Sequence, residues 1–103
     1  MENQSAAHFY ENLNTKFRVN VESTEPIELE LAEVELRKSE PNEQEGMERF
    51  SVFFYGPDNM FLPQQTYELS HPEMGELAIF LVPIGRDERG FLYEAVFNRF
   101  LGD

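Results

Sequence analysis

The residues that could carry chemistry are few and lie far apart in this chain of 103 residues. His8 and His71 are its two imidazoles, and a catalytic or metal-binding role for either would require partner groups that converge on the ring. Pro72 restricts His71 to extended backbone, so we expect the His71 ring to bind neighbouring backbone groups in a turn. The chain has no cysteine, which excludes thiolate chemistry, disulfides and cysteine-ligated metal sites.

Glu94 is the carboxylate that could act as a general acid. It shares the parity of Leu92 and Val96 in a predicted strand, and burial there would raise its pKa. A structural pair with Arg49 or Arg99, or a position facing solvent, explains the residue more simply.

The other patterns that could bind a ligand or substrate fall short of a site. A stripe of carboxylates offers the oxygens that calcium prefers, but no D-x-D-x-D-G loop is present, and charge along a strand also prevents edge-to-edge pairing. The stripe consists of Glu28, Glu30, Glu33 and Glu35. No serine lies in a G-x-S-x-G context, and no G-x-x-x-x-G-K-[ST] phosphate loop appears. We therefore expect no catalytic residue, no metal site and no cofactor.

The composition narrows the class of protein and of partner. With 20 acidic and 8 basic residues the formal charge is −12, which disfavours binding to nucleic acid and to anionic membranes. No apolar run approaches the roughly 20 residues of a membrane-spanning helix, and no secretory signal pattern opens the chain, so we expect a cytoplasmic protein. An apolar fraction of 41% with 14% aromatics predicts a folded core rather than a disordered acidic tail.

The first half of the chain predicts a short helix and two strands. Apolar residues recur at helical spacing over 5–13, with a serine at the N-cap. Polar and apolar residues then alternate over 16–22 and again over 27–37, as in half-buried strands. The second alternation changes phase near Ala32–Glu33, which predicts a β-bulge. A polar, acidic loop follows at 38–48.

The second half predicts four more strands, separated by turn signals. These strands lie at about 49–56, 64–71, 76–84 and 91–100. Gly75 can supply a positive φ, and the polar residues 85–90 have the length of a hairpin connection. We predict a mainly β fold with one short N-terminal helix: a small antiparallel six-stranded meander that forms a partly open barrel or sandwich. The whole chain, 1–103, would form a single domain.

An ordered series of motifs from Phe50 to Arg99 resembles a family of small bacterial domains of unknown function. In this chain the motifs are F-S-V-F-F-Y-G-P, L-P-Q-Q-T-Y, H-P-E-M-G, F-L-V-P-I-G and Y-E-A-V-F-N-R. Relatives often have glycine where this chain has Gln65, a departure that bears on any bulge or tight bend at that point. The resemblance implies no activity. It implies an accessory or assembly role beside phage-tail-collar-like proteins.

Surface character supplies the leading functional hypothesis, a non-catalytic protein-interaction or assembly-accessory domain. The edge strands of a small β domain can accept a partner's strand, and protein interfaces are enriched in Tyr and Phe. The rings that we assign to an unidentified protein partner, or to a second copy in a homodimer, are Phe53, Tyr55, Phe61 and Phe100.

Two alternatives stay open at this point. One is a small-molecule-binding β-barrel or enzyme with an interior pocket near Glu94, to which Gln64 and Asn98 could add polar groups. The other is an acidic decoy that occupies the nucleic-acid site of a basic protein. An internal or cleft pocket of roughly several hundred Å³ would favour the first, and steep salt dependence of partner binding would favour the second.

Overall fold

The computed structural model describes residues 5–20, 27–36 and 47–100, with only the backbone for 47, 48, 99 and 100. This part of the chain forms one short helix and six strands. The elements are α1 (Ala6–Glu11), β1 (Lys16–Val19), β2 (Ile27–Leu36), β3 (Met47–Gly56), β4 (Gln65–His71), β5 (Gly75–Asp87) and β6 (Gly90–Phe100). The expected fold class, mainly β with a short N-terminal helix, is confirmed.

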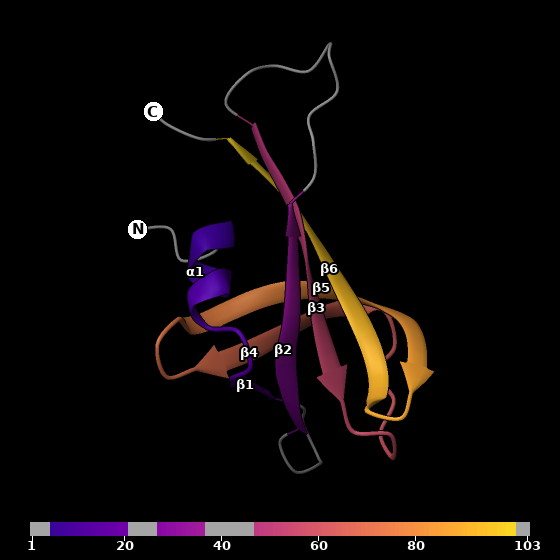
Figure 1. Cartoon of the computed structure of the whole chain (residues 1–103). Coiled ribbons are helices and arrows are strands. Elements are labelled where there is room, and N and C mark those ends of the chain that lie inside the picture. Colours follow the sequence, from indigo (N-terminus) through magenta and orange to yellow (C-terminus); the bar gives the residue numbers. More distant parts are fainter. Residues whose placement is uncertain (1–4, 21–26, 37–46, 101–103) are drawn as a thin grey trace.

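The strands form one antiparallel ring in the order β1-β2-β3-β6-β5-β4 (Figure 1). The order departs from a consecutive meander at two places, because β3 is paired with β6 and β4 is paired with β1. The ladder between β3 and β6 runs along the whole of β3. Within the described residues, β1 and β4 are joined by the pairs Arg18–Ser70 and Val19–Leu69 and by the Asn20 N–H, which donates to the Glu68 carbonyl at 3.1 Å. This is the shortest of the described ladders.

The predicted β-bulge lies where the phase of the sequence changes. The register between β2 and β3 shifts between Leu31 and Glu33, and this shift keeps Leu31 and Val34 both buried. Leu31 also anchors the segment before β1, since its carbonyl accepts from the Asn14 N–H (2.8 Å) and its own N–H donates to the Thr15 carbonyl (3.0 Å). The bulge therefore bends β2 while the core face stays continuous.

Aromatic rings fill the barrel interior. Phe17 and Phe54 are fully buried and meet edge to face with ring centroids 5.3 Å apart, an arrangement that aromatic quadrupoles favour. Phe9 from α1 is also fully buried and lies 6.0 Å from Phe50 and 5.4 Å from Phe97, centroid to centroid. The helix thus adds a ring to the same core and lies over one end of the barrel (Figure 1).

The connection between β3 and β4, residues 57–64, covers the other end. Its Leu62 is buried, and the Leu62 N–H donates to the hydroxyl of fully buried Tyr93 at 3.0 Å. The Tyr67 hydroxyl donates to the Pro63 carbonyl at 2.6 Å, which ties the same connection to β4. Because both tyrosine hydroxyls have partners, their rings can be buried without an unsatisfied polar group.

The structure corrects several expected boundaries. The helix, expected over 5–13, ends at Glu11. Its expected N-cap is confirmed, since the Ser5 hydroxyl accepts from the His8 N–H. The acidic loop expected at 38–48 lies outside the described residues up to 46, and 47 and 48 belong to the backbone of β3. Gln65, where relatives often have glycine, begins β4 and pairs with Leu81. Gly75 has the positive φ, 79°, that its turn was expected to require.

The hairpin between β5 and β6 is much tighter than the six-residue connection that polarity predicted. Asp87 pairs with Gly90, so only two residues form the loop. The Asp87 carboxylate accepts from the Arg89 N–H at 2.8 Å, and Gly90 has φ 127°, where a Cβ would collide with the Gly56 carbonyl. Residues 85–87 are exposed to solvent at the end of β5. Their polar character predicted a loop, whereas the structure extends the strand through them.

Truncation of Phe54 tests the filled interior. Phe54→Ala removes a fully buried ring from the centre of the core, so we expect the free energy of unfolding to fall by about 3–5 kcal/mol. Phe80→Ala is the matched control, since Phe80 lies on β5 with 49% of its surface exposed. Chemical denaturation measures both, and a loss below about 1 kcal/mol for Phe54→Ala would contradict this account of the core.

Candidate functional site

His71 is a structural residue of the turn between β4 and β5. It is buried, and its ring centroid lies 4.3 Å from that of Phe17. The His71 Nδ1 accepts from the backbone N–H groups of Glu73 (3.0 Å) and Met74 (3.1 Å). The proton must then sit on Nε2, which lies 2.8 Å from the Thr15 hydroxyl oxygen.

This arrangement favours the neutral imidazole. The Thr15 hydroxyl donates to the Asn12 carbonyl at 2.6 Å and can accept the Nε2 proton of His71. A proton on Nδ1 would face two N–H donors. Burial lowers the pKa of His71 below its ordinary value of 6.5, and the Glu73 carboxylate opposes part of that shift. The bonds to the Glu73 and Met74 N–H groups are those that the sequence predicted for a ring in a turn. The contact with Thr15, which joins the segment before β1 to the β4–β5 turn, was not predicted.

Glu94 faces away from the barrel interior. Its neighbours Tyr93 and Ala95 are buried in the core, so the alternation of β6 places Glu94 on the outer face. The Glu94 Oε2 accepts from the hydroxyl of buried Ser51 at 2.8 Å. The expectation of an interior pocket near Glu94 is therefore wrong, because the interior is filled with rings and Glu94 lies on its outside. Gln64 and Asn98, its expected companions, are exposed.

The carboxylate stripe of β2 faces outward along the strand. Glu28, Glu33 and Glu35 are exposed, and Glu30 is half-buried. Within the described ranges, no group of three His, Asp or Glu side chains could hold a metal ion. The same ranges contain no helix long and apolar enough to cross a membrane.

The four rings assigned to a partner do not form one cluster. Tyr55 and Phe53 are half-buried on the outer face of β3, and Phe61 is 51% exposed in the 57–64 connection. Phe61 packs edge-on against half-buried Phe91, with ring centroids 5.2 Å apart. The side chain of Phe100 lies outside the described residues, and its backbone pairs with the first residue of β3, at the far end of the ladder.

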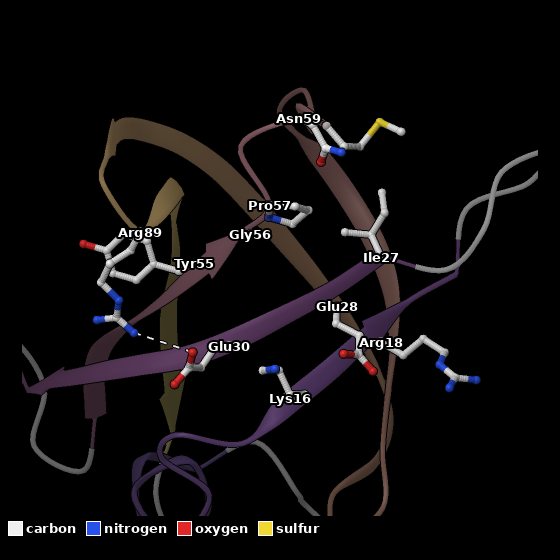
Figure 2. A pocket seen from close by; sticks show the side chains of 11 residues that line it. Lys16, Arg18, Ile27, Glu28, Glu30, Tyr55, Gly56, Pro57, Asn59 and Arg89 are labelled. Carbon is white, nitrogen blue, oxygen red and sulfur yellow. Dashed lines mark ion pairs between the residues drawn. The ribbon is translucent and has the colours of Figure 1, made fainter.

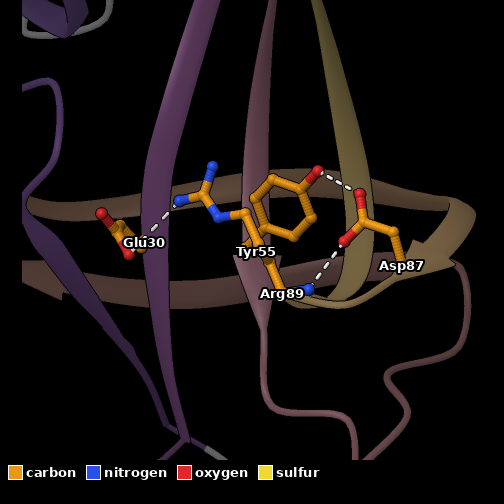
Figure 3. Close-up of polar contacts among 4 residues, drawn as sticks. All are labelled: Glu30, Tyr55, Asp87 and Arg89. Carbon is orange, nitrogen blue, oxygen red and sulfur yellow. Dashed lines mark hydrogen bonds and ion pairs between the residues drawn. The ribbon is translucent and has the colours of Figure 1, made fainter.

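Tyr55 belongs to a polar network that joins three strands and the β5–β6 hairpin (Figure 3). Its hydroxyl donates to the Asp87 carboxylate at 2.6 Å, and the Arg89 guanidinium lies over the Tyr55 ring, 4.2 Å from its centroid. Arg89 Nη2 also lies 3.6 Å from the Glu30 carboxylate. The hydrogen bond between Tyr55 and Asp87 raises the pKa of the Tyr55 hydroxyl and lowers the pKa of the Asp87 carboxyl.

An open groove of about 680 Å³ lies beside this network, between the outer faces of β1 and β2 and the start of the 57–64 connection (Figure 2). We call it the Arg18 groove. Its charged side chains are Lys16, Arg18, Arg89, Glu28 and Glu30, and its less polar wall includes Ile27, Tyr55 and Met60. A second hollow, of about 620 Å³, lies on the other side of β1 and shares Lys16, Arg18 and Glu28 with the first. Neither hollow includes Glu94.

Sequence reasoning missed the cations of this groove. The alternation of Lys16 and Arg18 with buried Phe17 and Val19 does show that these two cations face outward. Alternation cannot show that β1 lies near the end of β3 and the β5–β6 hairpin, because that proximity depends on pairings between distant segments. Arg89 was placed in a polar connection, and nothing local connects it to Tyr55.

Comparison with protein families matches residues 4–97 of the chain to one family, described as "Domain of unknown function (DUF6916)". No curated protein and no solved structure matches the chain. The matched range begins just before α1 and reaches into β6. The description of the family assigns no activity, so a function has to be argued from the surface.

Replacement of His71 tests its role in the turn. The unfolded chain takes up a proton at His71 near pH 6.5, whereas the folded chain resists it. The contribution of neutral His71 to the free energy of unfolding is therefore fully present above about pH 6.5 and decreases as the pH falls below that value. In His71→Asn the side-chain amide oxygen can accept in place of Nδ1 but does not titrate, so we expect unfolding free energy to lose its dependence on pH between about 7.5 and 5.5.

His8→Asn is the control for that measurement, because it removes the other, exposed imidazole. It should keep the pH dependence of the wild-type chain. An equal pH dependence in His71→Asn and the wild type would show that His71 does not resist protonation in the fold.

Removal of the Tyr55 hydroxyl tests the polar network. In Tyr55→Phe the Asp87 carboxylate loses the hydrogen bond that most strongly lowers its pKa, so we expect the Asp87 pKa, followed by NMR titration of the carboxyl carbon, to rise toward its ordinary value. Tyr10→Phe serves as the control, since the Tyr10 hydroxyl donates to the Val34 carbonyl instead. An unchanged Asp87 pKa in Tyr55→Phe would mean that the hydrogen bond does not persist in solution.

Proposed function

This chain belongs to that family of domains of unknown function, and we propose that it is a non-catalytic protein-interaction domain with an accessory role in assembly. The partner that the family resemblance implies is a phage-tail-collar-like protein. A homodimer is the other form that such an interaction can take. The proposal concerns the outer surface of the barrel, because the interior is occupied by its own side chains.

The exposure of Phe61 is the observation that carries this proposal. The ring is 51% exposed although the neighbouring Leu62 is buried, and the adjacent Met60 is 38% exposed. An apolar side chain left in water forgoes about 25 cal/mol for each Å² that burial would remove. Phe, Met and Arg are also enriched in the cores of protein interfaces. Here the Arg86 guanidinium lies 5.4 Å from the centroid of Phe91, the ring against which Phe61 packs.

The small-molecule alternative has less support. Ligand sites bury most of a bound small molecule in a concave, largely preformed cavity. The described hollows beside β1 are open to solvent, and both ends of the barrel are covered by the chain itself. An extended segment or a protein surface fits such open hollows better than a small molecule does.

Capture with the tagged full-length chain tests the proposal. We expect one stoichiometric protein to be recovered from the native host by the wild type, with affinity reduced about tenfold or more in Phe61→Ser. Phe80→Ser is a matched control, because Phe80 has a similar exposure of 49% on a different part of the barrel. It should retain the partner.

Light scattering on the purified chain completes this experiment. A dimer that Phe61→Ser dissociates and Phe80→Ser does not would support the homodimeric form of the proposal. Recovery of a bound metabolite without any protein, or equal capture by Phe61→Ser and the wild type, would contradict it.

A further inference from the structure

We propose that the Arg18 groove binds an extended acidic segment of the partner protein. The inference rests on the proposed function, because it names the surface and the chemistry through which the partner is recognised. The occupant would place carboxylates over β1, against Lys16 and Arg18, and an apolar side chain toward Met60 and Tyr55. Three observations carry this inference: the cations of β1, which have no charged partner among the described residues, the local balance of charge, and the shape of the two hollows.

The two cations of β1 point outward without a charged partner among the described residues. Lys16 is directly opposite Glu30 in the β1–β2 register, and Arg18 is opposite Glu28. Such cross-strand neighbours often form ion pairs, but the ion pair in this region joins Glu30 to Arg89 instead. Figure 2 shows the Arg18 side chain extending away from the Glu28 carboxylate. The guanidinium and ammonium groups are therefore available to carboxylates from another molecule.

The charge in the Arg18 groove differs from the charge of the chain. Three cations and two carboxylates line this groove, whereas the chain as a whole carries −12. The second hollow adds the Glu73 carboxylate, so the carboxylates of the occupant belong in the Arg18 groove. The Arg89–Glu30 pair is long, at 3.6 Å, and both side chains are partly exposed, so it contributes little and can exchange partners. A carboxylate that enters the groove would meet Lys16 and Arg18 at short range, where charge-assisted hydrogen bonds are strongest.

The shape of the surface favours an extended segment. The Arg18 groove and the second hollow lie on either side of β1 and share Lys16 and Arg18 as a common boundary. Both are open along the surface, so a chain can cross β1 from one hollow to the other. The less polar wall lies at one end only, near Met60 and Tyr55. This distribution fits an amphipathic strand of peptide rather than a compact ligand.

The test compares two blocked, fluorescein-labelled peptides by fluorescence anisotropy with the full-length chain. One has the sequence Glu-Asp-Leu-Asp-Glu-Phe, and the other has the uncharged counterpart Gln-Asn-Leu-Asn-Gln-Phe. We expect the acidic peptide to bind about tenfold more tightly or better. Salt dependence alone would be ambiguous, because salt also screens repulsion between the peptide and the other carboxylates of the chain.

Matched variants locate the binding. Arg18→Gln and Lys16→Gln should each weaken binding of the acidic peptide several-fold and leave the uncharged peptide unchanged. Arg49→Gln removes the same type of cation from β3, outside the groove, and should bind like the wild type. Thermal unfolding checks that each variant folds. Equal binding of the two peptides, or wild-type binding by Arg18→Gln, would overturn the inference, and so would competition by free glutarate at the same concentration as the peptide.

The same variants separate this inference from the proposed function. If a protein partner is captured in a Phe61-dependent way and the double variant Lys16→Gln/Arg18→Gln retains it fully, the acidic-segment inference fails and the proposed function stands. If no partner is recovered by any form of the chain, the proposed function fails, whatever the peptides do. Loss of the captured partner in the double variant but not in Arg49→Gln would support both.

Discussion

The fold depends on the filling of one small barrel by aromatic rings. Phe17, Phe54 and Tyr93 are fully buried inside the ring of strands, and Phe9 is buried with them from the helix. Because Tyr93 carries a hydroxyl, its burial requires a donor or acceptor, and the Leu62 N–H supplies it. That hydrogen bond helps to hold the 57–64 connection over the end of the barrel. Core packing and loop placement are therefore parts of one constraint.

The same core fixes the surroundings of the two residues that the sequence brought forward for chemistry. Within the described residues, each of them has a partner in the fold. His71 joins two segments through its two ring nitrogens, and Glu94 accepts from buried Ser51 on the outer face. Phe61 is one of several exposed apolar side chains on the described surface, and Lys16 and Arg18 face outward on β1.

Much of the fold could be predicted from local pattern. The alternation in β1 and β2 predicted which side chains face the core, and the change of phase near Ala32–Glu33 predicted the bulge. The hairpin was predicted less well, because exposed polar residues at the end of a strand have the composition of a loop. The pairing of β3 with β6 had no local signal. This pairing depends on the two hairpins that join β4, β5 and β6, because they place β6 beside β3.

The sequence by itself determined the class of fold, the core faces of β1 and β2 and the absence of cysteine chemistry, because these follow from residue type and from a period of two. Only the tertiary structure decided which outward residues meet. Tyr55, Asp87, Arg89 and Glu30 come from β3, the β5–β6 hairpin and β2, and they converge because β3 pairs with β2 on one side and with β6 on the other. Periodicity describes one segment at a time, whereas a groove is made by segments far apart in the chain.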